Sequence, residues 1–148
     1  MYTIDASVWV NGFDRREPGH ATSRQLLDLL ATRSIPIVVP NLVLAEVAGA
    51  ISRTRNNTAQ AEAFAVLLGN LPNVTLVPLD NVLAQQTQTL AARHALRGAD
   101  AVYAAVALQA NCTLISLDNE HLTRLTGVVR TCTPATALAD LTSSPPTP

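Results

Sequence analysis

Short apolar segments alternate with longer segments of helical periodicity along the whole chain, and this alternation most limits the fold that it can adopt. Apolar runs predict buried strands over residues 2–4, 35–39, 74–77, 113–117 and 128–131. Helical stripes predict helices over residues 7–12, 21–33, 40–51, 58–68, 81–94 and 99–110, and a short helical turn over 120–125. Strands that alternate with helices form parallel sheets, so we predict an α/β fold with helices on both faces of the sheet.

The length of 148 residues fits a single domain with a substantial core. Aromatic residues make up only 3% of the chain, so the core must be built from Leu, Val, Ile and Ala. We expect one domain over residues 1–133, followed by a C-terminal extension over 134–148. The Ser- and Pro-rich residues 143–148 are predicted to be disordered.

The chain shows neither a run of about 20 apolar residues nor a basic and apolar N-terminal leader, so we expect a cytoplasmic protein without a membrane span. Cys112 and Cys132 do not form a disulfide framework or a zinc signature, and we expect reduced, buried thiols. His20, His94 and His121 also lack metal-ligand spacing, which favours solvated or core histidines.

Four acidic side chains occupy positions that are unusual for a solvated surface. Asp5 directly follows the first predicted strand and Asp118 the fourth, and parallel α/β sheets bind ligands at the carboxyl ends of their strands. Glu46 lies on an apolar helix stripe, and Asp100 opens a helix that is apolar on nearly every side. The other acids have surroundings typical of a solvated surface.

Each of these acids also has a structural interpretation. Asp5 and Asp118 could be turn or N-cap residues, and for Asp100 taken alone an N-cap is favoured. Glu46 could pair with Arg53, two helical turns further on. Converging carboxylates repel one another, however, and such a cluster makes physical sense chiefly around a divalent metal. Oxygen ligands indicate Mg²⁺ or Mn²⁺, which can activate water for attack on a phosphodiester.

The same residues resemble the PIN-domain family. Residues 2–7, with Asp-x-Ser, are similar to its opening strand, and residues 42–47 to the helix that carries its glutamate. Residues 97–108 resemble its third motif and residues 113–118 its fourth, where the family often has threonine in place of Ser116. The order and spacing of the motifs, across residues 2–131, carry the resemblance.

The resemblance implies a Rossmann-like domain with a central five-stranded parallel sheet, and an endoribonuclease that depends on Mg²⁺ or Mn²⁺. It implies that the metal is held by four acids: Asp5, Glu46, Asp100 and Asp118. Ser7 would orient Asp5, and Ser116 keeps the hydroxyl of the family's threonine. Weaker candidates for contact with substrate are Arg97, Asn11 and Asn119, for which cap, loop or solvated roles are favoured.

The compact length resembles the VapC-type toxins of toxin–antitoxin pairs. This resemblance implies a homodimer, inhibited by a small antitoxin that covers the active-site groove, and an RNA substrate. Glu120 and His121 lie just past Asp118 and could touch a second metal or the leaving group. For both residues we favour an ordinary place in the first turn of a short helix.

Other functions remain open. A domain for phosphotransfer through an aspartyl-phosphate would also have Asp after its first strand, but it calls for a lysine, and all ten basic residues here are arginine. A non-catalytic binding module of the same fold would not need to keep costly like charges together. A DNA-directed nuclease is less favoured than a ribonuclease, because the short chain shows no second region for gripping duplex DNA. The glycines are scattered, and none forms a phosphate-binding loop motif.

Overall fold

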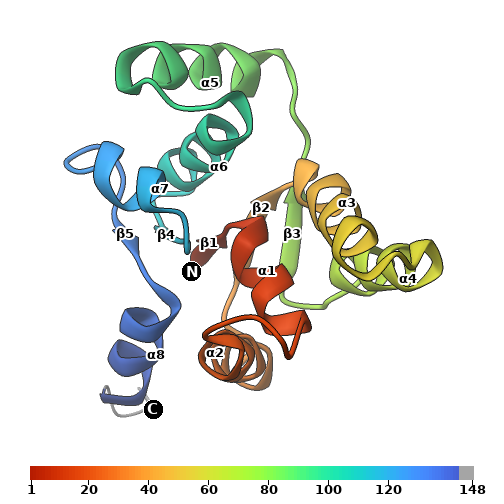
Figure 1. Cartoon of the computed structure of the whole chain (residues 1–148). Helices are drawn as coiled ribbons and strands as arrows, with labels where there is room; N and C mark the ends of the chain where they lie inside the picture. The colour runs from red at the N-terminus through yellow and green to blue at the C-terminus, as the bar shows by residue number, and fades with distance from the viewer. Residues whose placement is uncertain (144–148) are drawn as a thin grey trace.

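The fold is built on one parallel sheet of five strands, as the sequence predicted (Figure 1). In this computed structural model, residues 1–143 are described, so most of the predicted disordered tail, residues 144–148, lies outside the described residues. The strand order is β3-β2-β1-β4-β5, and every neighbouring pair is parallel. The strands are β1 (Tyr2–Ile4), β2 (Ile37–Pro40), β3 (Val74–Val77), β4 (Thr113–Ile115) and β5 (Thr131–Cys132).

Helices cover both faces of this sheet. They are α1 (Ala6–Phe13), α2 (His20–Thr32), α3 (Leu42–Arg55), α4 (Thr58–Gly69), α5 (Asn81–His94), α6 (Gly98–Gln109), α7 (Asn119–Arg124) and α8 (Pro134–Ser143). Figure 1 shows α5 and α6 above the strands, α1 and α2 reaching below them, and α3 and α4 to the right, beside β3. This arrangement follows from right-handed crossovers, because the chain moves first toward β3 and then back toward β5.

Several boundaries differ from the predictions: β2 begins at Ile37 and not at residue 35, β4 ends at Ile115 and not at residue 117, and α3 continues to Arg55. Pro40 ends β2, opposite Val77, instead of starting the following helix, which begins at Leu42. The stretch predicted as the fifth strand is partly a turn: the N–H of Val128 donates to the carbonyl of Leu125, and Gly127 has a φ of 79°. The paired strand begins only at Thr131. Apolar character alone does not show where a ladder starts.

The C-terminal extension contains a helix that the sequence pattern did not predict. Helix α8 packs against α2, with Ala137 fully enclosed. The guanidinium of Arg33, at the end of α2, donates to the carbonyl of Leu141 (2.8 Å). The extension is therefore docked on the domain at least as far as Ser143.

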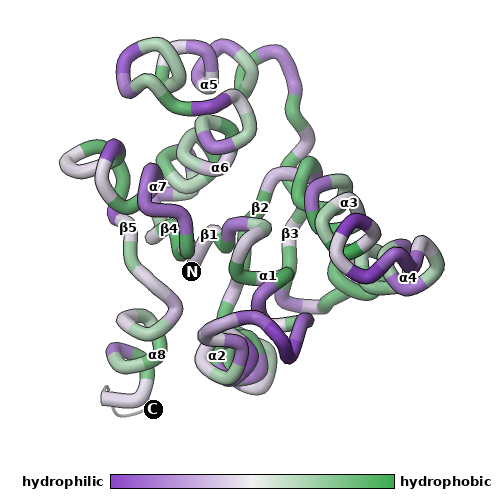
Figure 2. The backbone as a smooth tube through the Cα atoms, viewed as in Figure 1, coloured by the Kyte–Doolittle hydropathy of each residue, from purple (hydrophilic) through white to green (hydrophobic). Residues whose placement is uncertain are grey.

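Helix α6 forms the centre of the core. Its residues from Ala101 to Ala107 are all buried, and the helix lies across β1, β2 and β4. The alanines let the helix approach the sheet closely, which confirms the predicted deep burial. Green, hydrophobic segments line this interface in Figure 2, whereas the loop between α1 and α2 is purple. No helix within residues 1–143 is both long and apolar enough to cross a membrane.

Both thiols are free, as predicted. Cys112 is buried, and its sulfur lies 3.2 Å from Thr3 Oγ1. Cys132 was predicted to be buried but is only half-buried, and burial raises the pKa of its thiol to about 11. The Cys132 thiol therefore stays protonated near neutral pH.

Candidate active site

Asp5 stands where β1 ends and α1 begins. It is 7% exposed and serves as the N-cap of α1. Its Oδ2 accepts hydrogen bonds from the Ser7 amide (3.2 Å), the Ser7 hydroxyl and the Ser116 hydroxyl (3.2 Å). The predicted contact with Ser7 is thus present. No hydrogen bond within residues 1–143 uses Oδ1 of Asp5, so one carboxylate oxygen is left for another partner.

Glu46 reaches the same region from the second turn of α3. Its Oε2 accepts a hydrogen bond from the Tyr103 hydroxyl on α6 (2.6 Å). Burial and the adjacent carboxylate raise the pKa of Tyr103 far above its usual range, so the phenol stays a donor. The alternative pairing with Arg53 is not an ion pair in the described part of the chain.

Asp100 lies in the first turn of α6, but it is not the cap. Arg97 holds the N-cap position, so the N-cap interpretation of Asp100 was wrong. Its Oδ1 lies 3.8 Å from Nε2 of His121. Its Oδ2 is buried and has no hydrogen-bond partner among the described residues. A buried carboxylate oxygen without a donor is costly, which points to a missing cation or solvent partner.

Asp118 follows β4 and is the N-cap of α7, where its Oδ1 accepts from the Glu120 amide (2.7 Å). The alternative capping role is thus confirmed, whereas Asp118 lies three residues after Ile115, the last residue of β4, and not directly after the strand as predicted. The Ser116 hydroxyl, two residues earlier, accepts from the Asp118 amide (2.9 Å) and donates to Asp5. Ser116 is completely buried and joins the two aspartates through one oxygen atom.

The charges of these carboxylates affect the pKa of Glu46 and Asp100. Burial raises the pKa of Glu46, and the charges of Asp5 and Asp100 raise it further, while the Tyr103 hydrogen bond acts in the opposite direction. Burial also raises the pKa of Asp100; the charges of Asp118 and Asp5 raise it further, while His121 and Arg97 lower it. Every predicted acid thus acts on at least one other. No arginine of residues 1–143 forms an ion pair with any of them.

The acids do not, however, form a closed ligand shell. Within residues 1–143, no three His, Cys, Asp or Glu side chains lie close enough together to hold a metal ion as they stand. The donor set still fits a hard divalent cation, since it consists of carboxylates, repels itself and includes the partnerless Oδ2 of Asp100. Mg²⁺ in particular is bound through one or two carboxylates and retains several waters.

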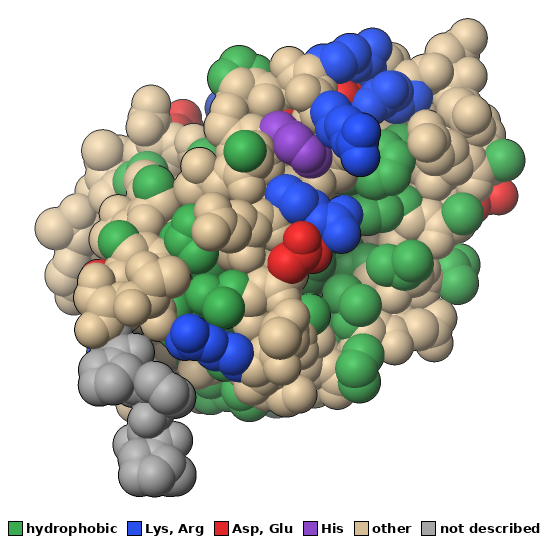
Figure 3. All heavy atoms as spheres, turned by 90° about the horizontal axis from the view of Figure 1, so that it is seen from below, with side chains coloured by type: hydrophobic (Ala, Val, Ile, Leu, Met, Phe, Trp, Pro, Cys, Tyr) green, Lys and Arg blue, Asp and Glu red, His purple; other side chains and the backbone are tan. Residues whose placement is uncertain are grey.

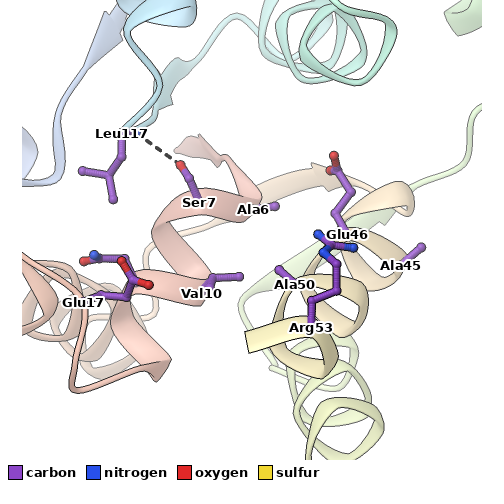
Figure 4. A pocket seen from close by; sticks show the side chains of 10 residues that line it. Ala6, Ser7, Val10, Glu17, Ala45, Glu46, Ala50, Arg53 and Leu117 are labelled. Carbon is purple, nitrogen blue, oxygen red and sulfur yellow. Dashed lines mark hydrogen bonds between the residues drawn. The ribbon is translucent and has the colours of Figure 1, made fainter. Parts of the chain in front are cut away.

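A pocket of about 680 Å³ opens beside this cluster, between α1 and α3 (Figure 4). Ser7 and Glu46 line it on the side of the acids, and Arg53 and Glu17 line it further out. The side chain of Arg53 folds back along α3 toward Gly49. A Cβ added to Gly49 would lie only 3.1 Å from Nη1 of Arg53. The pocket therefore leads from the carboxylates to an exposed guanidinium.

The weaker candidates occupy different places. Asn11 is buried and lines the pocket, but its Nδ2 donates to the carbonyl of Pro18 (2.8 Å), which ties down the following loop. Asn119 is exposed in the first turn of α7. Arg97 is exposed, with Nη2 3.9 Å from Glu120. For all three, the observed contacts agree with the structural roles that the sequence favoured.

Sequence reasoning missed Tyr103 as a residue of the site, and it named His121 as a possible site residue but favoured an ordinary helix position for it. Tyr103 was counted only as part of an apolar helix, although it is the donor to Glu46. His121 was assigned an ordinary helix position, yet it is 0% exposed and lies between Asp100 and Ser116. The available signal was its spacing, five residues after Ser116 and three after Asp118.

A fifth unusual acid was also missed. Asp14, placed in a polar loop by the sequence, is only 3% exposed. Its carboxylate accepts from Arg16 Nε and Nη2 (3.1 and 2.9 Å) and from Arg55 Nη2 (2.6 Å). These hydrogen bonds and charges hold the pKa of Asp14 well below its usual range. This cluster ties the end of α1 to the end of α3.

Comparison with known proteins agrees with this architecture. The family model described as PIN domain matches residues 2–127. No curated protein matches by sequence. The fold resembles the sarcin-ricin loop cleaving toxin VapC20 of Mycobacterium tuberculosis, with a TM-score of 0.72, 18% identity, and coverage of 87% of this chain and 96% of that one.

Other solved structures share the fold across nearly their whole length. PAE2754 from Pyrobaculum aerophilum has a TM-score of 0.70 and 20% identity, and the match covers 97% of each chain. A toxin–antitoxin complex from Klebsiella pneumoniae has a TM-score of 0.66 and 17% identity, with 90% of this chain and 98% of that one covered. The strand order, the acids at the strand ends and the family match agree: the chain belongs to the PIN domain family.

Proposed function

We propose that this protein is an endoribonuclease that depends on Mg²⁺ or Mn²⁺, and that it acts as the toxin of a VapBC-type pair. The observation that carries the proposal is a set of neighbouring carboxylates that no arginine of residues 1–143 pairs with, two of which, Glu46 and Asp100, have a pKa raised by burial and by the nearby acids. A folded protein keeps such a cluster when an external cation completes it. Membership of the PIN domain family agrees with this chemistry.

Asp5, Glu46, Asp100 and Asp118 are the proposed metal ligands. When bound, the ion would polarise a phosphodiester and lower the pKa of a bound water. Ser7 and Ser116 hold Asp5 by its Oδ2. Tyr103 holds Glu46 in the same way, by Oε2. The chain's own contribution is to fix one oxygen of these acids and leave the other one free.

The pocket between α1 and α3 is the proposed path of the RNA next to the cluster. Arg53 lines it, and seven residues separate Arg53 from Glu46, about 10 Å along a helix. That is within reach of a phosphate neighbouring the one that is cleaved. Figure 3 shows further arginine side chains gathered on the face seen from below. Arginine suits this role because its planar fork binds phosphate oxygens in pairs.

The proposed partner is an antitoxin protein, since several of the solved structures that share the fold are toxin–antitoxin complexes. In such a pair the antitoxin would cover the groove that holds the acids. We further propose a homodimer and a location in the cytoplasm. Both follow from the resemblance to VapC-type toxins.

The proposal is tested by incubating the purified protein with defined RNAs in Mn²⁺ or Mg²⁺, with and without a chelator. We expect internal cleavage that the chelator stops and that Asp5→Asn abolishes. Asp28→Asn is the matched control, because Asp28 is an exposed acid that pairs only with Arg24 on the surface. Cleavage by the Asp5 variant at the wild-type rate would refute the metal site. RNA binding without any cleavage would favour the non-catalytic module.

A further inference from the structure

His121 lies inside the acid cluster without being one of its acids. We propose that His121 is a positioning residue of the metal site: it orients the Ser116 hydroxyl, and through it Asp5. This inference rests on the proposed metal site. It adds a residue that the family motif, as matched in this chain, does not include.

The contacts of the imidazole ring lead to two different parts of the site. Nδ1 lies 3.0 Å from Ser116 Oγ, at the end of β4. Nε2 lies 3.2 Å from the backbone carbonyl oxygen of Asp100 and 3.8 Å from its Oδ1. One rigid ring therefore spans β4 and α6, whose acids have no hydrogen bond to each other among the described residues.

The contact at Nδ1 decides what the serine can do. Ser116 Oγ has one proton and three neighbours: the Asp118 amide, which donates to it, the Asp5 carboxylate, and His121. An ionised carboxylate can only accept, so the hydroxyl donates to Asp5 only when Nδ1 of His121 acts as a donor. The two lone pairs of Ser116 Oγ then accept from the Asp118 amide and from Nδ1, and the hydroxyl proton can point only toward Asp5. The position of Asp5 Oδ2 depends on that orientation.

Packing alone does not explain a histidine at this position. The ring is completely buried, and an aliphatic side chain would fill the space without burying two polar nitrogens. Its face lies near Tyr103, with ring centroids 6.3 Å apart in an edge-on arrangement. Tyr103 in turn donates to Glu46. The histidine thus touches the partners of three proposed ligands.

Three substitutions distinguish the contact made by Nδ1 from the contact made by Nε2. His121→Asn places an amide where Nδ1 was and keeps a donor for Ser116. His121→Gln places the amide nearer the position of Nε2 and removes the contact with Ser116. His121→Leu removes both. We would measure the Mn²⁺ concentration that gives half of the maximal rise in melting temperature, which needs no catalysis.

We expect the half-maximal Mn²⁺ concentration to rise about tenfold in His121→Gln and His121→Leu, the range known for partners that orient metal ligands. His121→Asn should stay within about threefold of the wild type, and the KM for RNA at saturating Mn²⁺ should not change. Ser116→Ala should have an effect like that of His121→Leu. The double variant should add little, because both changes act through the same hydroxyl.

Equal Mn²⁺ responses in the wild type, His121→Gln and His121→Leu would overturn this inference and leave the metal site standing. So would additive effects of His121→Leu and Ser116→Ala. If Mn²⁺ does not change the melting temperature of the wild type, the metal site itself is refuted, and the inference with it. If His121→Leu does not fold, the comparison of the Asn and Gln variants still decides, because both keep a polar side chain.

Discussion

The protein encloses carboxylates in two regions, and it treats them in opposite ways. Around Asp14, two arginines from the chain itself satisfy the charge, and the pKa of the acid is lowered. At the carboxyl ends of β1 and β4, burial and neighbouring carboxylates raise the pKa of Glu46 and Asp100. Both regions lie on the same α1–α3 side of the fold, at opposite ends of the two helices.

The comparison distinguishes a structural acid from a functional one. Asp14 receives its counter-charge when the chain folds, so the pair can only stabilise the domain. The cluster of Asp5, Glu46, Asp100 and Asp118 has no such ion pair with an arginine of residues 1–143, so folding brings like charges together at a cost. Such repulsion lowers the stability of the folded protein without metal and increases its affinity for a bound cation. A buried acid is therefore a candidate for a functional site only where no arginine of the chain pairs with it.

The largest effect expected is on cleavage by Asp100→Asn. This change removes a proposed ligand and should lower the rate more than about a hundredfold, beyond the range typical of partners that merely orient metal ligands. It also removes a charge that Asp118 and Asp5 repel, so the metal-free melting temperature should stay the same or rise. Both quantities are measured on one preparation, by RNA cleavage and by thermal unfolding without metal. A variant that loses activity and stability together would place Asp100 with the structural acids.

Asp14→Asn should give the reverse pattern. The amide cannot balance Arg16 and Arg55, so the link between α1 and α3 weakens and the melting temperature falls by several degrees. Cleavage per folded molecule at low temperature should stay near the wild-type rate. Asp28→Asn serves as the control, since it breaks an exposed pair of little worth. Loss of cleavage in a fully folded Asp14 variant would show that the two regions are not independent.

The sequence pattern predicts the acids at the strand ends, but it does not predict the buried ion pairs of Asp14. Asp5 and Asp118 follow predicted strands, and parallel strands end at one edge, so local pattern predicts their meeting. Asp14 looks like an ordinary loop acid, because its partner Arg55 is 41 residues away and nothing local marks the pair. The same holds for Tyr103 and Glu46, which are 57 residues apart. Helix α8 was missed because it forms by docking on α2.

Tyr103→Phe should have a smaller effect, confined to the functional region. It removes the one hydrogen-bond donor of Glu46 while keeping the buried ring. The pKa of Glu46, already raised, should rise further, because that hydrogen bond lowers it. We expect the half-maximal Mn²⁺ concentration to rise a few-fold, in line with a net hydrogen-bond contribution of about 1 kcal/mol. An unchanged Mn²⁺ response would show that Tyr103 is only a core residue.

The smallest effect expected is a difference in pH dependence between the two regions, measured without metal. Glu46 and Asp100 have raised pKa values in the folded state, so they bind protons more tightly than in the unfolded chain. Their repulsion lowers the free energy of unfolding near neutral pH and is relieved as the pH falls toward about 4. Asp14 has a lowered pKa, so its contribution is present above about pH 4 and is lost as the pH falls further. The advantage of Asp100→Asn in melting temperature should therefore shrink between pH 7 and 4, while the deficit of Asp14→Asn stays constant there and shrinks only below pH 4. Parallel curves for the two variants would mean that a single kind of buried acid is present.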